Sequence, residues 1–203
     1  MKNKSCILYL VRHGETEWNV KRLIQGHKDI PLNEKGKQQA IKLARQLRNI
    51  RFDAIYSSDL KRTSETAELI GIERNLKIIT SKSLRERDFG SFAGRSFGKE
   101  KNIMKLINNL KLALESETRG IENDKNLMER FVGFMEKISK ENFGKTILVV
   151  SHAGPMRTFL IRLGWGTYEN LTEGCISNLA YVKLQSTGKE FMVKKTYGIT
   201  KIE

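Results

Sequence analysis

Residues 6–14, with the sequence CILYLVRHG, decide the fold: six apolar residues lead directly into an arginine, a histidine and a glycine. A short apolar run with such flanks is typical of a buried strand. Residues 146–154, TILVVSHAG, repeat the arrangement, and their apolar part is of the kind that is buried on both faces of a sheet. Because ligands bind outside the carboxyl ends of such strands, the two motifs predict one shared site.

Short apolar segments alternate with longer amphipathic segments along the rest of the chain. Further strands are expected at residues 53–57, 76–80, 180–184 and 191–193. Helices are expected at residues 33–50 (capped by Asn33), 59–70, 126–140 and 155–163. This alternation predicts an α/β fold, a three-layer α/β/α sandwich with a mostly parallel central sheet. Since no repeat or linker interrupts residues 1–203, we expect a single domain.

The composition is that of an ordinary globular protein, with 39% apolar and 30% charged residues among 203. No apolar run approaches the roughly 20 residues that cross a bilayer, and the first apolar run is too short for a signal peptide. A cytoplasmic protein without a membrane partner is therefore expected. Cys6 and Cys175 are expected to be small buried side chains rather than a disulfide framework.

The net charge of +14 is informative but has two interpretations. Such an excess attracts anions, among them nucleic acid, membrane surfaces and phosphorylated small molecules. It is equally compatible with a solvated basic surface, because the lysines are scattered. No recognised nucleic-acid-binding motif is present, so no nucleic-acid partner is expected. Oligomerisation stays open.

Three residues at the predicted strand ends have the chemistry of a phosphate site. His13 could act as a nucleophile if one ring nitrogen were held by a hydrogen bond and the other were free. Arg12 offers a planar fork of donors that matches phosphate oxygens. His152 follows the second strand and opens a helix, whose N-terminal amides favour phosphate. Each residue alone has a structural explanation, such as a satisfied histidine at a strand end.

Two further candidates lie between these motifs. Arg62 falls in the first turns of a helix, where a cation opposes the helix dipole, which makes sense if it holds an anion. Glu86 lies between two arginines and could protonate a leaving oxygen, although Asp88 competes for that role. An exposed arginine and an ion-paired glutamate are the structural alternatives. His27, the third histidine, is expected at the surface or at the rim of the site.

Taken together, these motifs resemble the histidine phosphatase superfamily, also called the phosphoglycerate mutase-like family. The resemblance covers most of the chain and lies, in the family's order, in residues 10–19 (LVRHGETEWN), 25–40 (from QG to GKQQA), 57–63 (SSDLKRT), 84–94 (from LRE to G) and 150–154 (VSHAG). A lone Arg-His-Gly would be weak, but five ordered blocks are a specific signal.

The resemblance implies a role for each matching position. His13 would take the phosphoryl group, and Glu86 would act as general acid and then as general base. Arg12, Arg62 and His152 would hold the phosphoryl oxygens. The other expected substrate contacts are Asn19, Gln25, Gly26 and Ala153. Because positioning and charge neutralisation are what phosphoryl transfer requires, no metal and no cofactor are expected.

Two stretches bear on the type of activity. Residues 88–94 (DFGSFAG) and the short chain resemble the phosphatase branch, so a phosphomonoester hydrolase acting on a small phosphorylated metabolite is expected. A cofactor-dependent phosphoglycerate mutase and a non-catalytic phospholigand-binding protein are the alternatives. The family places a lid at about residues 95–126, where an apolar helical stripe and several lysines lie. Residues 120–123 (GIEN) depart from the family's Gly-Gly-Glu-Ser, which leaves a substrate contact by Glu122 in doubt.

Overall fold

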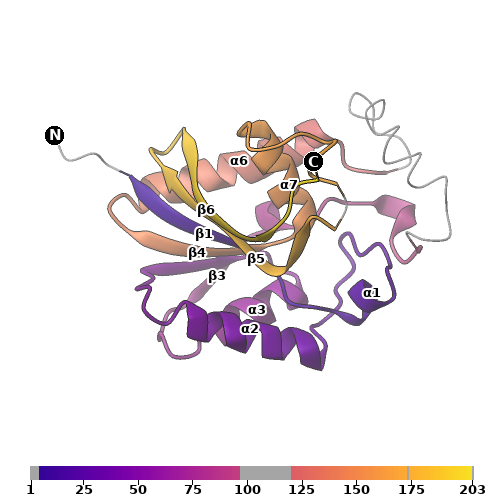
Figure 1. Ribbon diagram of the computed structural model, residues 1–203, viewed down its shortest axis with the longest axis horizontal. Helices are drawn as coiled ribbons and strands as arrows, with labels where there is room; N and C mark the ends of the chain where they lie inside the picture. Colours follow the sequence, from indigo (N-terminus) through magenta and orange to yellow (C-terminus); the bar gives the residue numbers. More distant parts are fainter. Residues whose placement is uncertain (1–4, 97–119, 173, 203) are drawn as a thin grey trace.

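The computed structural model describes residues 5–96, 120–172 and 174–202. A six-stranded sheet with the order β3-β2-β4-β1-β5-β6 forms its centre (Figure 1). The strands are β1 (Cys6–Arg12), β2 (Ala54–Ser57), β3 (Ile78–Thr80), β4 (Thr146–Ser151), β5 (Ile176–Ser186) and β6 (Phe191–Ile199).

The sheet is mostly parallel, as predicted. β1 pairs with β4, β4 with β2 and β2 with β3, all in parallel, whereas β5 is antiparallel to β1 and β6 to β5. The two late strands are longer than the expected 180–184 and 191–193. β5 lies between β1 and β6, so its backbone is paired on both sides, although Asn178, Lys183 and Gln185 interrupt its apolar pattern. Apolar runs alone therefore underestimate its length.

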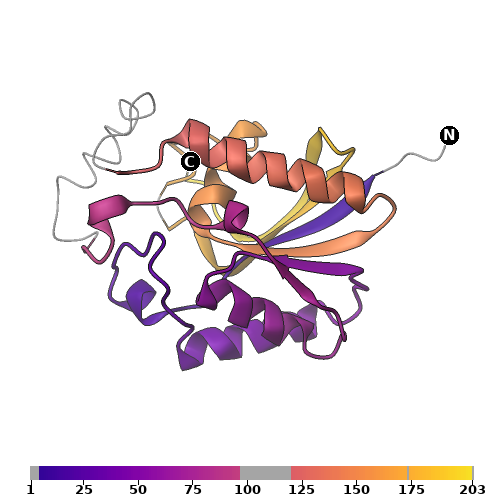
Figure 2. The ribbon, with the colours of Figure 1, turned by 180° about the vertical axis from the view of Figure 1, so that it is seen from behind.

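Helices cover both faces of the sheet, which confirms the three-layer arrangement (Figures 1 and 2). α2 (Glu34–Gln46) and α3 (Lys61–Gly71) lie on one face, and α6 (Asp124–Glu141) and α7 (Ala153–Arg162) lie on the other. Three short elements were not expected: α1 (Glu17–Val20), η1 (Lys82–Leu84) and η2 (Gly90–Phe92).

Side-chain oxygens fix the starts of the two long helices. The Oδ1 atom of Asn33 accepts a hydrogen bond from the backbone of Gly36 at 2.8 Å, which confirms Asn33 as the cap of α2. Asn123 caps α6 in the same way through the backbone of Asn126. That helix therefore begins two residues before the expected Asn126.

The uninterrupted apolar run of β1 reflects burial on both faces. Leu8 and Leu10 belong to the core beneath α6 and α7, whereas Tyr9 and Val11 belong to the core above α2 and α3. Successive residues of a strand point to opposite faces, so both cores draw on the same segment. This double burial fixes the position at which β1 ends, and with it the residues that follow.

Some expectations lie outside the described residues. The predicted lid falls largely on residues 97–119, including its apolar stripe and its lysines, and it stays a prediction, as does the single domain. Cys6 and Cys175 are both buried thiols, as expected. Within the described segments, none of the helices is both long enough and apolar enough to span a bilayer.

Candidate active site

The pairing of β1 with β4 brings the two histidine motifs together. Arg12 lies opposite Ser151 in the parallel register, so His13 and His152 are the next residues on the two strands. The backbone N–H of His13 continues the ladder by donating to the carbonyl of Ser151 at 3.0 Å. The imidazole rings lie edge to face with centroids 5.2 Å apart. Two histidines about 140 positions apart in the sequence thus lie side by side at the carboxyl ends of neighbouring strands.

His13 is held in the form that a nucleophile needs. Its Nδ1 lies 2.7 Å from the carbonyl oxygen of Gly14, and because a carbonyl only accepts, Nδ1 carries the proton. Nε2 then has the lone pair. Burial, followed by the charges of Arg62 and Arg12, holds the pKa of His13 well below its usual value. The ring is therefore neutral at physiological pH.

Arg62 contacts His152 and determines which nitrogen of that ring carries the proton. Arg62 is fully buried in the first turn of α3, and its Nε donates to Nδ1 of His152 at 3.2 Å. A guanidinium only donates, so the proton of the neutral His152 ring lies on Nε2. That nitrogen is buried and has no hydrogen-bond partner within the part of the chain that the structure describes. Burial, then the charge of Arg62, lowers the pKa of His152 well below its usual value.

The buried guanidinium of Arg62 also donates hydrogen bonds to the backbone of the loop at residues 26–28. Its terminal nitrogens donate to the carbonyls of Lys28 at 2.7 Å and Gly26 at 2.8 Å. Burial lowers the pKa of Arg62 to about 10, so the side chain stays protonated at neutral pH. A fixed cation thus lies beside two neutral histidines.

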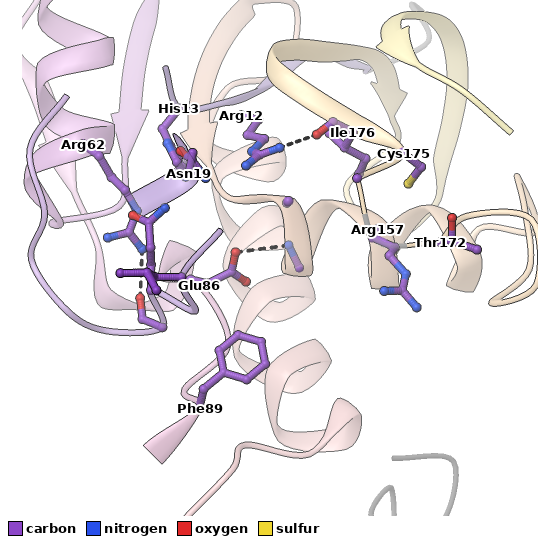
Figure 3. A pocket seen from close by; sticks show the side chains of 16 residues that line it. Arg12, His13, Asn19, Arg62, Glu86, Phe89, Arg157, Thr172, Cys175 and Ile176 are labelled. Carbon is purple, nitrogen blue, oxygen red and sulfur yellow. Dashed lines mark hydrogen bonds between the residues drawn. The ribbon is translucent and has the colours of Figure 1, made fainter. Parts of the chain in front are cut away.

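Most of the predicted site residues line one pocket at the carboxyl ends of these strands (Figure 3). Its lining includes Arg12, His13, Asn19, Gln25, Gly26, Arg62, Glu86 and Ala153. His152 lies behind them, against Arg62 and His13. Nη1 of Arg12 donates to the carbonyl of Ile176 at 2.5 Å, which places a second cation in the wall. The structure therefore gathers the two arginines and the neutral His13 around one small space.

Asn19 presents its amide in a fixed orientation. Its Oδ1 accepts from the backbone and hydroxyl of Thr16, each at 3.1 Å, and from Nδ2 of Asn178 at 3.4 Å. With the oxygen committed, the Nδ2 end of Asn19 is the donor side. Asn178 also donates to the carbonyl of His13 at 3.0 Å. Asn178 was not predicted, because only the antiparallel pairing of β5 with β1 brings it here.

Glu86 is the carboxylate that lines the pocket. Its Oε1 accepts from the backbone of Arg87 at 2.8 Å, and its Oε2 accepts from the backbone of Gly154 at 3.3 Å. Asp88, the competing candidate, is about half-exposed, with its Oδ2 3.5 Å from Nδ1 of His27. Of the two carboxylates, only Glu86 lines the pocket.

Two further residues have contacts that the sequence did not indicate. His27 is at the surface, as expected, with its side chain 31% exposed, and its Nε2 donates to the carbonyl of Glu86 at 2.8 Å. Glu122, whose substrate contact was in doubt, forms an ion pair with Arg130 in α6. The side chain of His27 thus contacts the backbone of Glu86, and the side chain of Glu122 contacts the backbone of Asp88 nearby.

The rest of the pocket lining was not predicted. It consists of Leu23, Phe89, Gly154, Arg157, Thr172, Gly174, Cys175 and Ile176. Arg157 on α7 follows His152 by five residues, a spacing that does not mark a shared helix face, so the sequence carried no signal for this third cation. Among residues 5–96, 120–172 and 174–202, no group of three or more His, Cys, Asp or Glu side chains could hold a metal ion.

Comparison with known proteins agrees with this geometry. The family described as "Histidine phosphatase superfamily (branch 1)" matches residues 8–197. The uncharacterized phosphatase PhoE of Bacillus subtilis is 30% identical over 188 residues, which cover 91% of this chain and 93% of that protein. Phosphoserine phosphatase 1 of Hydrogenobacter thermophilus is 38% identical over 160 residues, which cover 77% of this chain and 75% of that protein.

A solved structure of similar shape is the phosphoglycerate mutase from Bacillus anthracis. It is 28% identical with a TM-score of 0.82, and the match covers 97% of this chain and 94% of that one. These two relatives in sequence are named as phosphatases, which supports a phosphatase enzyme. With the family match over nearly the whole chain, the protein belongs to the histidine phosphatase superfamily.

Proposed function

We propose that the protein hydrolyses small phosphomonoesters through a phosphohistidine formed on His13. The observation that carries the proposal is the pair of buried, neutral histidines in opposite tautomers. His13 has a lone pair on Nε2, whereas His152 has a proton there, and Arg12 and Arg62 lie beside them. A nucleophile and two cations in one pocket, with a hydrogen-bond donor directly behind them, are what a phosphoryl group requires.

In the first step, Nε2 of His13 attacks phosphorus and forms a P–N bond. The bond from phosphorus to the ester oxygen breaks, and Glu86 in its acid form gives its proton to that oxygen, so that a neutral alcohol leaves. Arg12, Arg62 and Nε2–H of His152 would hold the three remaining phosphoryl oxygens. Positioning and charge neutralisation of this kind are the main contributions to phosphoryl transfer.

In the second step, water replaces the alcohol. Glu86, now a carboxylate, takes a proton from the water as its oxygen attacks phosphorus. The P–N bond breaks, which releases inorganic phosphate and restores the lone pair of His13. The cycle returns Glu86 to its acid form. Because fixed cations neutralise the phosphoryl charge, the scheme uses no metal and no cofactor.

The substrate is expected to be a small phosphorylated metabolite. The proposal rests on Arg12 and Arg62, which suit one phosphoryl group, and on Arg157 elsewhere in the pocket lining. This third cation favours substrates that carry another negative group besides the phosphate. The similarity to a protein named phosphoserine phosphatase 1 agrees with this class.

A phosphoglycerate mutase is the second candidate, favoured by the shape similarity to the protein from Bacillus anthracis. Both activities would form the same phosphohistidine, and they differ in whether water or a second hydroxyl accepts the phosphoryl group. A non-catalytic phospholigand-binding protein is the third candidate. It has less support, because the nucleophile, both arginines and the carboxylate all line the pocket.

The deciding experiment measures phosphate release from a panel of phosphomonoesters in EDTA, beside 3-phosphoglycerate isomerisation with and without 2,3-bisphosphoglycerate. Release that His13→Ala abolishes and Glu86→Gln lowers by about 100-fold or more supports the hydrolase. Asp88→Asn is the matched control, since that half-exposed carboxylate is near Glu86 in sequence and should leave release unchanged. Isomerisation without release would establish the mutase, and phosphate binding without turnover would establish the binding protein.

A further inference from the structure

Arg130 on α6 uses three donors of its guanidinium group on the segment that carries Glu86 and the other two on Glu122. Nη1 donates to the carbonyls of Ser83 and Arg85, both at 2.9 Å. Nη2 donates to the carbonyl of Glu86 at 2.9 Å and to Oε2 of Glu122 at 2.7 Å. Nε donates to Oε1 of Glu122 at 2.5 Å. A guanidinium has five N–H groups, and all five are accounted for.

Glu122 forms further hydrogen bonds with the segment that carries Glu86. Its Oε2 also accepts from the backbone N–H of Asp88 at 3.2 Å, and the carbonyl of Asp88 accepts from the backbone N–H of Glu122 at 2.9 Å. The carbonyl of Glu86 accepts a further hydrogen bond from His27. The backbone on both sides of Glu86 is thus fixed by an ion pair whose two side chains are mostly buried, at 22% and 14% exposure.

We infer that Arg130 and Glu122 are positioning residues, which set where the carboxyl group of Glu86 lies for proton transfer to the leaving oxygen. This inference rests on the proposed role of Glu86 as general acid. Proton transfer requires hydrogen-bond reach, so a shift of the backbone by a fraction of an ångström moves the carboxyl group out of range. The contacts of Arg130 are carbonyls and Glu122 rather than the pocket, so the pair acts through Glu86.

Lysine at position 130 tests this geometry directly. An ammonium group keeps the positive charge and can reach one or two acceptors, but it cannot reproduce a planar, two-sided contact with three carbonyls and a carboxylate. Glu122→Gln is the complementary change, because it keeps the shape of the side chain and removes the charge that orients Arg130. Both variants leave His13, Arg12, Arg62 and His152 in place.

The matched control is Arg74→Lys. Arg74 also donates to three backbone carbonyls, those of Leu47, Ile50 and Ile70, but on the α2–α3 side of the sheet. The chemical change is identical to that at Arg130, and the type of contact is similar. Any effect that comes from losing an arginine that binds carbonyls should appear in both variants.

The readout is kcat/KM, which reports transfer to His13, for two substrates of different leaving-group chemistry. p-Nitrophenyl phosphate releases an acidic phenol that departs without a proton, whereas an alkyl phosphate such as phosphoserine needs one. We expect Arg130→Lys and Glu122→Gln to lower kcat/KM for the alkyl phosphate about 10-fold or more beyond any loss with p-nitrophenyl phosphate. Vanadate affinity should stay within about 3-fold, and Arg74→Lys should leave the ratio of the two substrates unchanged.

Equal losses on both substrates, or an unchanged ratio in both variants, would overturn the inference. If Arg130→Lys does not fold, the ratio measured with Glu122→Gln decides alone. Failure of the proposed function is visible separately, since it would appear in the wild-type protein as missing turnover or as turnover that survives His13→Ala.

Discussion

A Cβ atom at position 154 would lie 2.1 Å from Oε1 of Glu86. The first turn of α7 and the carboxylate that faces the pocket can therefore be in contact because residue 154 is glycine. The backbone N–H of Gly154 donates to the same carboxylate at 3.3 Å, so one residue supplies both the space and a hydrogen bond.

Gly154→Ala should lower activity without unfolding the protein. The added methyl group meets the end of a flexible side chain, which can swing away at little cost, but the carboxyl group then leaves its position. We expect kcat/KM for an alkyl phosphate to fall about 10-fold or more. The control is Gly133→Ala on an exposed turn of α6, where a Cβ atom has open space. Equal activity of the two variants would contradict this arrangement.

Arg62→Lys should weaken anion binding. Lysine cannot donate at once to His152 and to the carbonyls of Gly26 and Lys28, so the tautomer of His152 would no longer be fixed. Losing charge-assisted hydrogen bonds corresponds to about 10- to 100-fold in the inhibition constant for vanadate. Arg45→Lys on the exposed side of α2 is the control. A vanadate constant that is unchanged in Arg62→Lys would argue against a phosphate contact.

The two buried histidines should make stability depend on pH. Their pKa values are lowered in the folded protein but lie near 6.5 in the unfolded chain. As the pH falls below 6.5, the unfolded state takes up protons that the folded state does not, so stability is lost. Each histidine contributes at most about 1.4 kcal/mol per pH unit to this slope.

Urea unfolding at pH 7.5, 6.5 and 5.5 measures the effect. We expect the unfolding free energy of the wild-type protein to fall more steeply below pH 6.5 than that of a variant carrying both His13→Gln and His152→Gln. Other titrating groups are common to the two proteins and cancel in the comparison. Parallel curves would mean that the two histidines take up protons in the folded state to the same extent as in the unfolded chain.

Turnover should persist in excess EDTA. In the proposed scheme Arg12, Arg62 and His152 neutralise the charge that a metal would otherwise neutralise. Phosphate release is measured after dialysis against EDTA and again after Mg²⁺ or Zn²⁺ is added. Activity that is lost on dialysis and recovered with either ion would refute a metal-independent reaction.

Arg157→Gln should change substrate preference rather than the chemistry. Arg157 lines the pocket, and its guanidinium also lies over the ring of Tyr168, 5.4 Å from the ring centroid. We expect KM to rise about 10-fold for a phosphomonoester with a second anionic group, and to change little for p-nitrophenyl phosphate. Arg162→Gln, an exposed position on the same helix, is the control. Equal changes for both substrates would exclude a contact with the second group.

Local patterns in the sequence were enough to predict part of this protein. Double burial makes a strand apolar at every position, so the runs before His13 and His152 could be recognised, and so could the strand ends at which both lie. The cap at Asn33 and the mostly parallel sheet follow from similarly local signals. Arg12 and Arg62 could be named as candidates for an anion site, although an exposed arginine was the alternative for Arg62.

Tertiary structure decided everything that depends on which segments lie side by side. Glu86 and Asp88 were equal candidates in the sequence, and only the tertiary structure shows that Glu86 lines the pocket and contacts α7. Asn178 reaches His13 through a strand pairing that spans 165 residues, and Arg130 reaches the backbone of Glu86 from 44 residues away. A hydrogen bond between a side chain and a distant carbonyl leaves no periodic trace in the sequence, because any residue has a carbonyl to offer.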